Sequence, residues 1–341
     1  MQLFLDSYGA FLNVRNGKFQ ITPKHNEPQS FATDDVEVIF LTEGVTATSD
    51  ALMLALEKSI PIVLLNYLGQ PVGQVWSGRF GSIATIRRHQ MLFAECTEGW
   101  LWMAHTLARK VENHQLTLRQ LAERYPTLFN DKNRKKLGST LATLDGLAKR
   151  FRRYDITDND YKRIAAEYRA LEATASRHYF RFMASVMPSE KWHFEARSTR
   201  PAKDYFNCML NYLYGMLYAQ VELSLIKVGI DPALGVLHVD RYNTPTMVYD
   251  FIEPYRHWAE IVALDLALED AVPDEGFSTS FETTGENGGF WLNSKAKGVV
   301  INRFLQYLNE PILFNKKQQK RLIVMDMEAQ QLATQLKNLS S

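Results

Sequence analysis

The stretch from Gly69 to Ser82, GQPVGQVWSGRFGS, divides the chain into two parts of different character. Its glycines and proline are typical of turns, and we interpret it as a domain boundary. Before it, short apolar segments predict strands. After it, from about Ile86, apolar residues recur at three and four spacing, which predicts helices. We therefore expect an α+β fold, with a small β-rich domain over residues 1–85 and a larger all-α domain over residues 86–341.

The part before the boundary contains four short apolar segments that predict β-strands: QLFLD (2–6), GAFLNV (9–14), VEVIFL (36–41) and IPIVLL (60–65). Asn16-Gly17 supplies the positive φ angles that a tight hairpin needs, so we expect a turn there. Between the last two segments, TSDALMLALEKS predicts a short helix that Ser49 or Asp50 caps.

The part after the boundary predicts a series of helices. The first periodic stretch starts at about residue 86, and further stretches cover roughly 133–153, 158–186, 203–228, 245–270, 293–307 and 317–338. Pro254 is expected to kink the helix that contains it. Residues 271–292 are polar and contain several glycines, so we expect a loop or short irregular elements there.

Composition limits the class of protein. The chain has 341 residues, is 46% hydrophobic and 23% charged, and carries a net charge of +1, which excludes a histone-like polycation but allows a local basic groove. Its two cysteines, Cys96 and Cys208, form no C-x-x-C pair, which disfavours a structural zinc site or a disulfide framework. No signal peptide and no apolar run of about 18 residues is present, so we expect a cytoplasmic protein without a membrane span.

Several polar residues lie within otherwise apolar helical stretches. Asn207, Asn211 and Tyr214 recur at four and three spacing and are expected to share one helix face, as are Asp250 and Glu253. Taken singly, a glutamate such as Glu172 is usually solvated, and a histidine after an apolar run is usually a structural residue. Spacing alone does not bring Glu172 beside His238, so periodicity by itself predicts no joint site.

Five motifs, in order along the chain, suggest a known family. They are LARKVENHQ (107–115), LEATASRHYF (171–180), RSTRPAKDYFNCMLNYLYGML (197–217), VGIDPALGVLH (228–238) and MVYDFIEPYR (247–256). Together they resemble the CRISPR-associated integrase family, the larger subunit of the spacer-acquisition machinery. The G-x-D-P-x-x-G-x-x-H motif followed by D-x-x-E is the specific part. The first motif departs from the family's Asn-Gln pair, because His114 stands between Asn113 and Gln115.

The resemblance implies a set of site residues. Glu172, His238 and Asp250 match the family's metal ligands, which are also its catalytic residues. Glu253 matches a fourth acidic position, and its longer side chain leaves open whether it binds metal directly or through water. An oxygen and nitrogen ligand set suits Mg²⁺ or Mn²⁺. The expected DNA-binding residues, in or beside these motifs, are Arg177, Arg197, Arg200, Lys203 and Arg256.

The implied activity is insertion of a short captured DNA into a CRISPR repeat array, by attack of a 3′-hydroxyl on a phosphodiester. The implied partners are double-stranded DNA (prespacer and repeat), a second copy of this chain bound through the β-rich domain, and the small CRISPR-associated protein two. Two alternatives stay open. One is a non-catalytic DNA-binding scaffold, and the other is a stand-alone metal-dependent nuclease or transposase-like enzyme. The remaining basic runs, such as DKNRKK (131–136), are interpreted as solvated helix faces.

Overall fold

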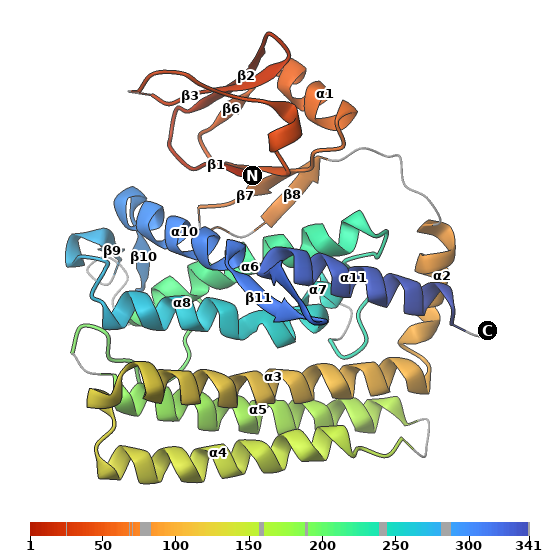
Figure 1. Cartoon of the computed structure of the whole chain (residues 1–341), viewed down its shortest axis with the longest axis vertical. Helices are drawn as coiled ribbons and strands as arrows, with labels where there is room; N and C mark the ends of the chain where they lie inside the picture. The colour runs from red at the N-terminus through yellow and green to blue at the C-terminus, as the bar shows by residue number, and fades with distance from the viewer. Residues whose placement is uncertain are drawn as a thin grey trace.

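The structure, a computed structural model, describes residues 1–24, 26–67, 69, 71–75, 83–156, 160–187, 190–238, 244–280 and 288–339. A β-rich region lies on a mostly helical body, and the N-terminus lies where the two meet (Figure 1). The expected α+β order is confirmed. The position of the domain boundary stays a prediction, because residues 76–82 lie outside the described residues.

The first sheet has the order β1-β5-β7-β8. Strands β1 (Gln2–Leu5), β5 (Val38–Thr42) and β7 (Ile62–Leu65) are parallel, and β8 (Pro71–Val75) runs antiparallel to β7. Strand β8 corrects the prediction of turns at this point. Pro71 and Gly73 of β8 are typical of turns. The segment is nevertheless extended, because it pairs with β7 along its length.

The second sheet has the order β4-β3-β2-β6 and contains the predicted hairpin. Strands β2 (Phe11–Arg15) and β3 (Lys18–Thr22) are joined by Asn16 and Gly17, whose φ angles are +52° and +69°. Strand β4 (Gln29–Phe31) pairs with β3, and β6 (Thr46–Ala47) with β2. Helix α1 (Ser49–Glu57) is capped by the Thr48 hydroxyl, one residue before the expected caps, because this oxygen accepts from the Ala51 amide.

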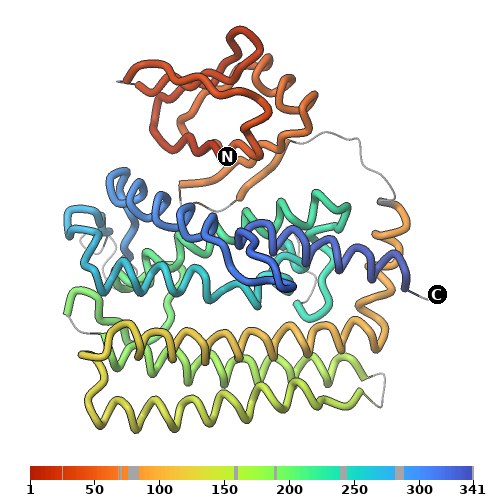
Figure 2. Tube along the Cα trace, in the orientation of Figure 1, coloured from red at the N-terminus to blue at the C-terminus, as the bar shows by residue number. Residues whose placement is uncertain are grey.

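The helical body begins with α2 (Ile83–Phe93) and α3 (Thr97–Arg124), where the sequence predicted one periodic stretch. Helices α3, α4 (Asp131–Arg152) and α5 (Tyr161–Val186) form one layer (Figure 1). Helix α6 (Tyr205–Lys227) is buried around most of its circumference, so it forms the centre of the body. Helices α10 (Ser294–Asn309) and α11 (Arg321–Lys337) cover it on the side seen in Figure 2.

Three segments after α6 differ in detail from the sequence prediction. The expected helix at 245–270 is broken into α7 (Thr246–Phe251), the 3₁₀ turn Glu253–Tyr255 and α8 (Arg256–Leu268), because Pro254 cannot continue the hydrogen-bond ladder. Strands β9 (Phe277–Thr279) and β10 (Phe290–Leu292) pair within the expected loop. Strands β11 (Pro311–Phe314) and β12 (Lys317–Lys320) form a hairpin where the start of a helix was expected.

The β-rich region packs on α6 through a small apolar cluster. Val38, Phe40, Val63 and Leu65 of the first sheet contact Ala219 and Leu223 of α6. A separate core lies between the two sheets and α1. In the described part of the chain, no helix is both long and apolar enough to cross a membrane.

Candidate active site

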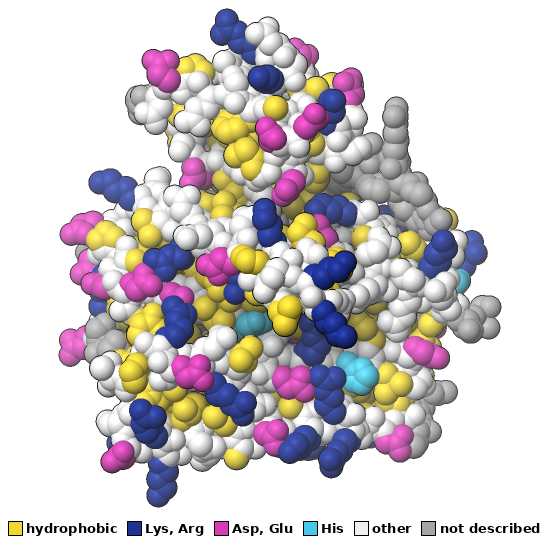
Figure 3. Space-filling view, in the orientation of Figure 1, with side chains coloured by type: hydrophobic (Ala, Val, Ile, Leu, Met, Phe, Trp, Pro, Cys, Tyr) yellow, Lys and Arg dark blue, Asp and Glu magenta, His cyan; other side chains and the backbone are white. Residues whose placement is uncertain are grey.

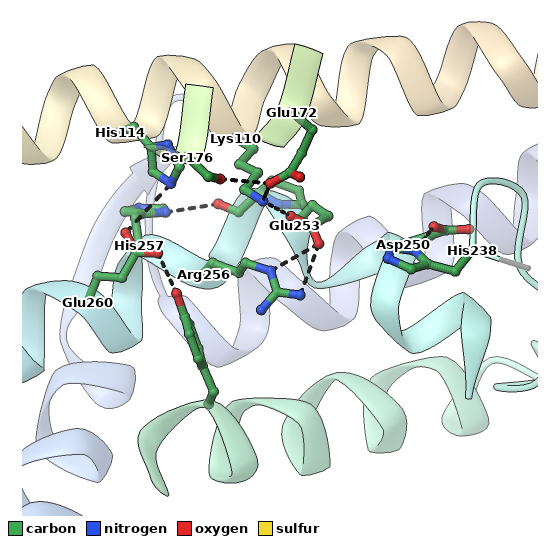
Figure 4. A network of polar contacts seen from close by, with 12 residues as sticks. Lys110, His114, Glu172, Ser176, His238, Asp250, Glu253, Arg256, His257 and Glu260 are labelled. Carbon is green, nitrogen blue, oxygen red and sulfur yellow. Dashed lines mark hydrogen bonds and ion pairs between the residues drawn. The ribbon is translucent and has the colours of Figure 1, made fainter. Parts of the chain in front are cut away.

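The centre of the site is a lysine between two carboxylates. Lys110 of α3 has a side chain that is only 7% exposed, and its ammonium forms ion pairs with Glu172 of α5 and with Glu253, the latter at 2.5 Å. Ser176, one turn after Glu172, also donates to the Glu172 carboxylate at 2.7 Å. Figure 4 shows Lys110 between the two glutamates. Three separate elements therefore direct one cation and two anions to a single point.

Both carboxylates are ionised at neutral pH. Burial alone would raise the pKa of Glu253, but the charges of Arg256 and Lys110 outweigh it and lower the pKa to about 2. Burial likewise opposes ionisation of Glu172, and the charge of Lys110 outweighs it, so its pKa is also lowered. For Lys110, burial lowers the pKa, while Glu253 and Glu172 raise it above its ordinary value. The cluster is held together by mutual charge compensation.

His238 and Asp250 form a second pair beside this centre. The Asp250 side chain is fully buried, and its Oδ1 lies 2.6 Å from Nδ1 of His238. Its Oδ2 accepts the backbone amides of Val236 and Leu237 at 2.6 and 2.9 Å. The carboxylate thus fixes the imidazole through Nδ1, so Nε2 is the ring nitrogen left to bind a ligand. In Figure 4 this pair lies apart from the glutamates.

Gly235 explains why Asp250 approaches the backbone so closely. A Cβ atom at Gly235 would lie 2.8 Å from the Thr246 carbonyl carbon and 2.9 Å from Oδ2 of Asp250. The glycine of the G-x-x-H motif is therefore needed for close packing of this loop on α7. The chain turns after Phe251, so Asp250 and Glu253 do not share one face and have different partners, contrary to the expectation from their spacing.

The donor chemistry of these residues fits a divalent cation. Two ionised carboxylates converge on a positive charge, here the Lys110 ammonium, and an imidazole oriented by a buried carboxylate lines the same cavity. Within the described residues, no three His, Cys, Asp or Glu side chains are already close enough to share one ion. Glu172, His238 and Glu253 line the cavity, whereas Asp250 lies behind His238 and is not part of its wall.

The cavity has a volume of about 1120 Å³ and extends from Lys110 to β8, β10 and α10. Its wall carries more basic than acidic side chains. The basic ones are Lys110, Arg169, Arg197, Arg200, Arg256 and Lys297. The acidic ones are Glu172, Glu222, Glu253 and Glu260. A cavity of this charge and size suits an anionic substrate.

The expected DNA-binding residues divide into two groups. Arg197, Arg200 and Arg256 line the cavity. Arg177 is exposed and is not in the cavity wall. Among the described residues, its hydrogen bonds are to Ala173 and Thr174 of its own helix. Lys203 is also outside the wall and donates to the Gly288 carbonyl. On the face shown in Figure 3, basic side chains lie among acidic ones, consistent with solvated surfaces.

Sequence reasoning gave no role to several residues of this site. Lys110 and Arg169 face the cavity, and the LARKVENHQ motif was the only signal that marked Lys110. Glu260 lies one helical turn after Arg256 and carried no signal beyond its apolar surroundings. Tyr212 and Tyr214 are buried and also line the cavity. The predicted shared face of Asn207 and Asn211 is also confirmed, because both amide oxygens accept from Arg197.

Fold and cavity together define the class: an α+β protein with an acidic and imidazole centre inside a basic cavity. The comparisons then give the family. The chain matches the model described as CRISPR associated protein Cas1 over residues 3–306 and belongs to this family.

One relative is the CRISPR-associated endonuclease Cas1 1 of Archaeoglobus fulgidus, which is 27% identical over 268 residues, covering 75% of this chain and 74% of that protein. Two solved structures show the same fold at 20% identity. A casposase bound to integration product has a TM-score of 0.78 and covers 98% of this chain and 90% of that chain. A Cas6-RT-Cas1–Cas2 complex also has a TM-score of 0.78, over 99% of this chain and 35% of that chain.

Proposed function

We propose that this chain is a metal-dependent DNA integrase that joins the 3′-hydroxyl of a short captured DNA to a phosphodiester in a CRISPR repeat array. Membership of the Cas1 family and relatives named as CRISPR-associated endonucleases support DNA strand chemistry. The likeness to a casposase bound to integration product favours strand transfer over simple cleavage. The likeness to a Cas1–Cas2 complex supports a small second subunit as partner.

One observation carries the proposal. Glu172 and Glu253 converge on a single cation within a basic cavity whose wall also holds His238. We propose Glu172, Glu253 and His238 as the direct ligands of Mg²⁺ or Mn²⁺. Asp250 is proposed as a positioning residue for His238, because both of its oxygens are already used and its side chain is fully buried. This changes the implied roles of Asp250 and Glu253.

The chain's own residues prepare the reaction. Asp250 keeps His238 in one tautomer and orientation. Arg197, Arg200 and Arg256 offset the negative charge of the DNA backbone, and Lys110 offsets the charge of the two glutamates. A bound divalent ion would supply charge neutralisation at the phosphate and activation of the attacking hydroxyl.

In the proposed reaction, the 3′-oxygen forms a new bond to phosphorus while the existing bond from phosphorus to the neighbouring 3′-oxygen breaks. One phosphodiester replaces another, so no nucleotide is hydrolysed. The hydroxyl proton passes to solvent and a proton returns to the displaced 3′-oxygen.

The alternatives predict different behaviour. A scaffold has no need for ionised, buried carboxylates around one cation, because such a cluster costs desolvation energy. A stand-alone nuclease would use water in place of the 3′-hydroxyl at the same centre. Only an assay that distinguishes joining from cleavage separates this alternative from the integrase.

The test uses a labelled short duplex, a plasmid that carries a repeat array, the small second subunit, and Mg²⁺ or Mn²⁺. A duplex with 3′-dideoxy ends is the control, because it lacks only the nucleophile. We expect joined products with the 3′-hydroxyl duplex and none with the dideoxy duplex or with EDTA. Plasmid cleavage that is equal with both duplexes, without joining, would show a nuclease. Absence of both activities, with DNA binding intact, would favour the scaffold.

A further inference from the structure

Tyr214 of α6 contacts two arginines of the cavity wall through its ring. The guanidinium carbons of Arg197 and Arg256 lie over its ring, at 5.4 and 5.2 Å from the centroid. Guanidinium groups are attracted to the face of an aromatic ring, so one ring helps to hold both cations. Two like charges held over one ring repel each other, and burial together with Arg256 lowers the pKa of Arg197. Because the two charges repel each other, the Tyr214 ring has to be held in place by a further contact.

Arg197 is fixed without being neutralised. Its two terminal nitrogens donate to the amide oxygens of Asn207 and Asn211, the latter at 2.8 Å. Among the described residues Arg197 forms no ion pair with a carboxylate, although the charges of Glu260 and Asp204 act on it from farther away. Amide oxygens orient the guanidinium but carry no net charge, so its positive charge is kept for a ligand. Arg256 in contrast shares its charge with Glu253 at 3.0 Å.

Glu260 of α8 is the anchor of Tyr214. The Glu260 side chain is fully buried, and its Oε1 accepts from the Tyr214 hydroxyl at 2.6 Å. His114 lies 3.8 Å from the other carboxylate oxygen and stacks on Tyr179. Burial alone would raise the pKa of Glu260, but His114, Tyr214 and Tyr179 outweigh it and lower the pKa to about 2. Burial and Glu260 hold the pKa of Tyr214 well above its ordinary range, so the hydroxyl stays a donor.

We infer that Glu260 is a positioning residue that, through the Tyr214 hydroxyl, sets Arg197 and Arg256 as a two-arginine site for one phosphate of the DNA backbone. The inference rests on the proposed function for the identity of the ligand. The geometry of the site itself does not depend on the identity of the ligand. It comes from the contacts among these four side chains and from the hydrogen bonds that Arg197 and Arg256 make to their other neighbours, which are Asn207, Asn211, Tyr218 and Glu253. Its place beside Glu253 puts the bound phosphate next to the proposed reaction centre.

A purely electrostatic role for Glu260 and a positioning role predict opposite effects of Glu260→Ala on DNA affinity. Removal of a carboxylate from a DNA-binding cavity reduces repulsion, so Glu260→Ala would then tighten DNA binding. A positioning role predicts weaker binding, because the Tyr214 ring loses its hydrogen bond and the two arginines lose a contact that helps to hold them. Two variants separate the cases further. Glu260→Gln loses the charge but keeps an oxygen that accepts from Tyr214, whereas Tyr214→Phe keeps the charge and the ring but loses the hydrogen bond.

The experiment measures binding of a fluorescent duplex by anisotropy at several salt concentrations, without divalent metal, so that no catalysis is required. We expect Glu260→Ala and Tyr214→Phe each to weaken binding about tenfold, with a salt slope smaller by about one unit for each phosphate that the variant no longer binds. The double variant should be no weaker than either single variant. Glu260→Gln should bind as wild type or tighter.

Asp265→Ala is the matched control. Asp265 lies on the same helix, pairs with Arg124 at 2.9 Å and with Tyr125, and is outside the cavity wall. We expect its DNA affinity to be unchanged or slightly increased. If Glu260→Ala does not fold, Tyr214→Phe carries the test, because it removes one oxygen only. Wild-type affinity and slope for Tyr214→Phe would overturn the inference.

A second arm separates this inference from the proposed function. Inorganic phosphate is titrated into wild type, Tyr214→Phe and Asp265→Ala and followed by ³¹P line broadening. If the wild type binds phosphate but not DNA, the proposed function fails while the two-arginine site stands. If Tyr214→Phe broadens the phosphate signal as much as wild type does, the positioning role of Glu260 fails whatever the DNA results.

Discussion

At the scale of single residues, the buried charges of the site are stable only because they compensate one another. Lys110 would be costly to bury alone, and so would Glu172 or Glu253, because each loses hydration. Together they form two ion pairs, and Arg256 adds a third on the other side of Glu253. Each charge is therefore tolerated only because its neighbours are present, and a change in one residue is expected to shift the others.

A metal-binding comparison tests the roles of Glu253 and Asp250. We expect Glu253→Gln and Glu172→Gln to abolish measurable Mn²⁺ binding in calorimetry, because each removes a direct carboxylate ligand. Asp250→Asn should weaken binding by only about 10–100-fold, as is usual for a residue that orients a ligating histidine. Circular dichroism checks that each variant is folded. Loss of binding in Asp250→Asn together with retention in Glu253→Gln would make Asp250 the ligand instead.

Acid unfolding tests the charge of Glu253. Its pKa in the folded protein is lowered to about 2 from an ordinary value of 4.5, so the ionised form stabilises the fold above about pH 4.5. That contribution is lost as the pH falls from about 4.5 to 2. We expect the free energy of unfolding, measured by urea titration in EDTA, to fall less steeply over this window in Glu253→Gln than in wild type. Glu57→Gln, on an exposed position of α1, should keep the wild-type slope.

At the scale of elements, junctions decide where the polar residues lie. The 3₁₀ turn that contains Pro254 separates α7 from α8. As a result, Asp250 contacts His238 and Glu253 contacts Lys110. A continuous helix would have placed both carboxylates on one face. The junction between α2 and α3 is equally tight, because Gly99 packs against the end of α2.

A glycine pair tests the packing of this junction. A Cβ atom at Gly99 would overlap the Phe93 carbonyl oxygen, so Gly99→Ala should lower the free energy of unfolding by about 1–3 kcal/mol or more. Gly146 is exposed on α4, and a Cβ there would meet nothing within 4 Å. Gly146→Ala should therefore raise stability by about 0.5–1 kcal/mol. Urea unfolding measures both, and equal effects of the two changes would contradict this account.

At the scale of the whole molecule, α6 connects the two parts of the chain. It contacts the first sheet through Ala219 and Leu223, contributes Tyr214 to the cavity and packs against α8 and α11. The reaction centre and the β-rich region are thus joined through one buried helix. The β-rich region also exposes large apolar side chains, among them Tyr8 and Val72.

We expect a two-fold dimer formed through the β-rich region, because symmetric dimers are the commonest closed assembly and this region exposes apolar surface. Light scattering at micromolar concentration should give the mass of a dimer. Val72→Lys, at a side chain that is 65% exposed on the sheet edge, should reduce the dimer fraction. Leu313→Lys, at a side chain that is 71% exposed in the helical body, is the control and should not. A wild-type monomer would refute the expectation.

Local physics made part of this structure predictable from the sequence alone. Asn16-Gly17 specifies a hairpin because both residues tolerate positive φ, and the 3.6-residue period specifies most of the long helices. The spacing of Asn207 and Asn211 placed both on one face, where they meet Arg197. These features depend on residues that are neighbours along the chain.

Only the tertiary structure decided the rest. Glu172 and Lys110 are 62 positions apart, and spacing cannot bring them together. The division of roles between Asp250 and Glu253 follows from the turn at Pro254 and from which donors face each carboxylate. Strand β8 and the hairpin of β11 and β12 depend on pairing partners more than on propensity. The physical reason is the same throughout: a side chain's role depends on what packs against it, and those neighbours come from distant parts of the chain.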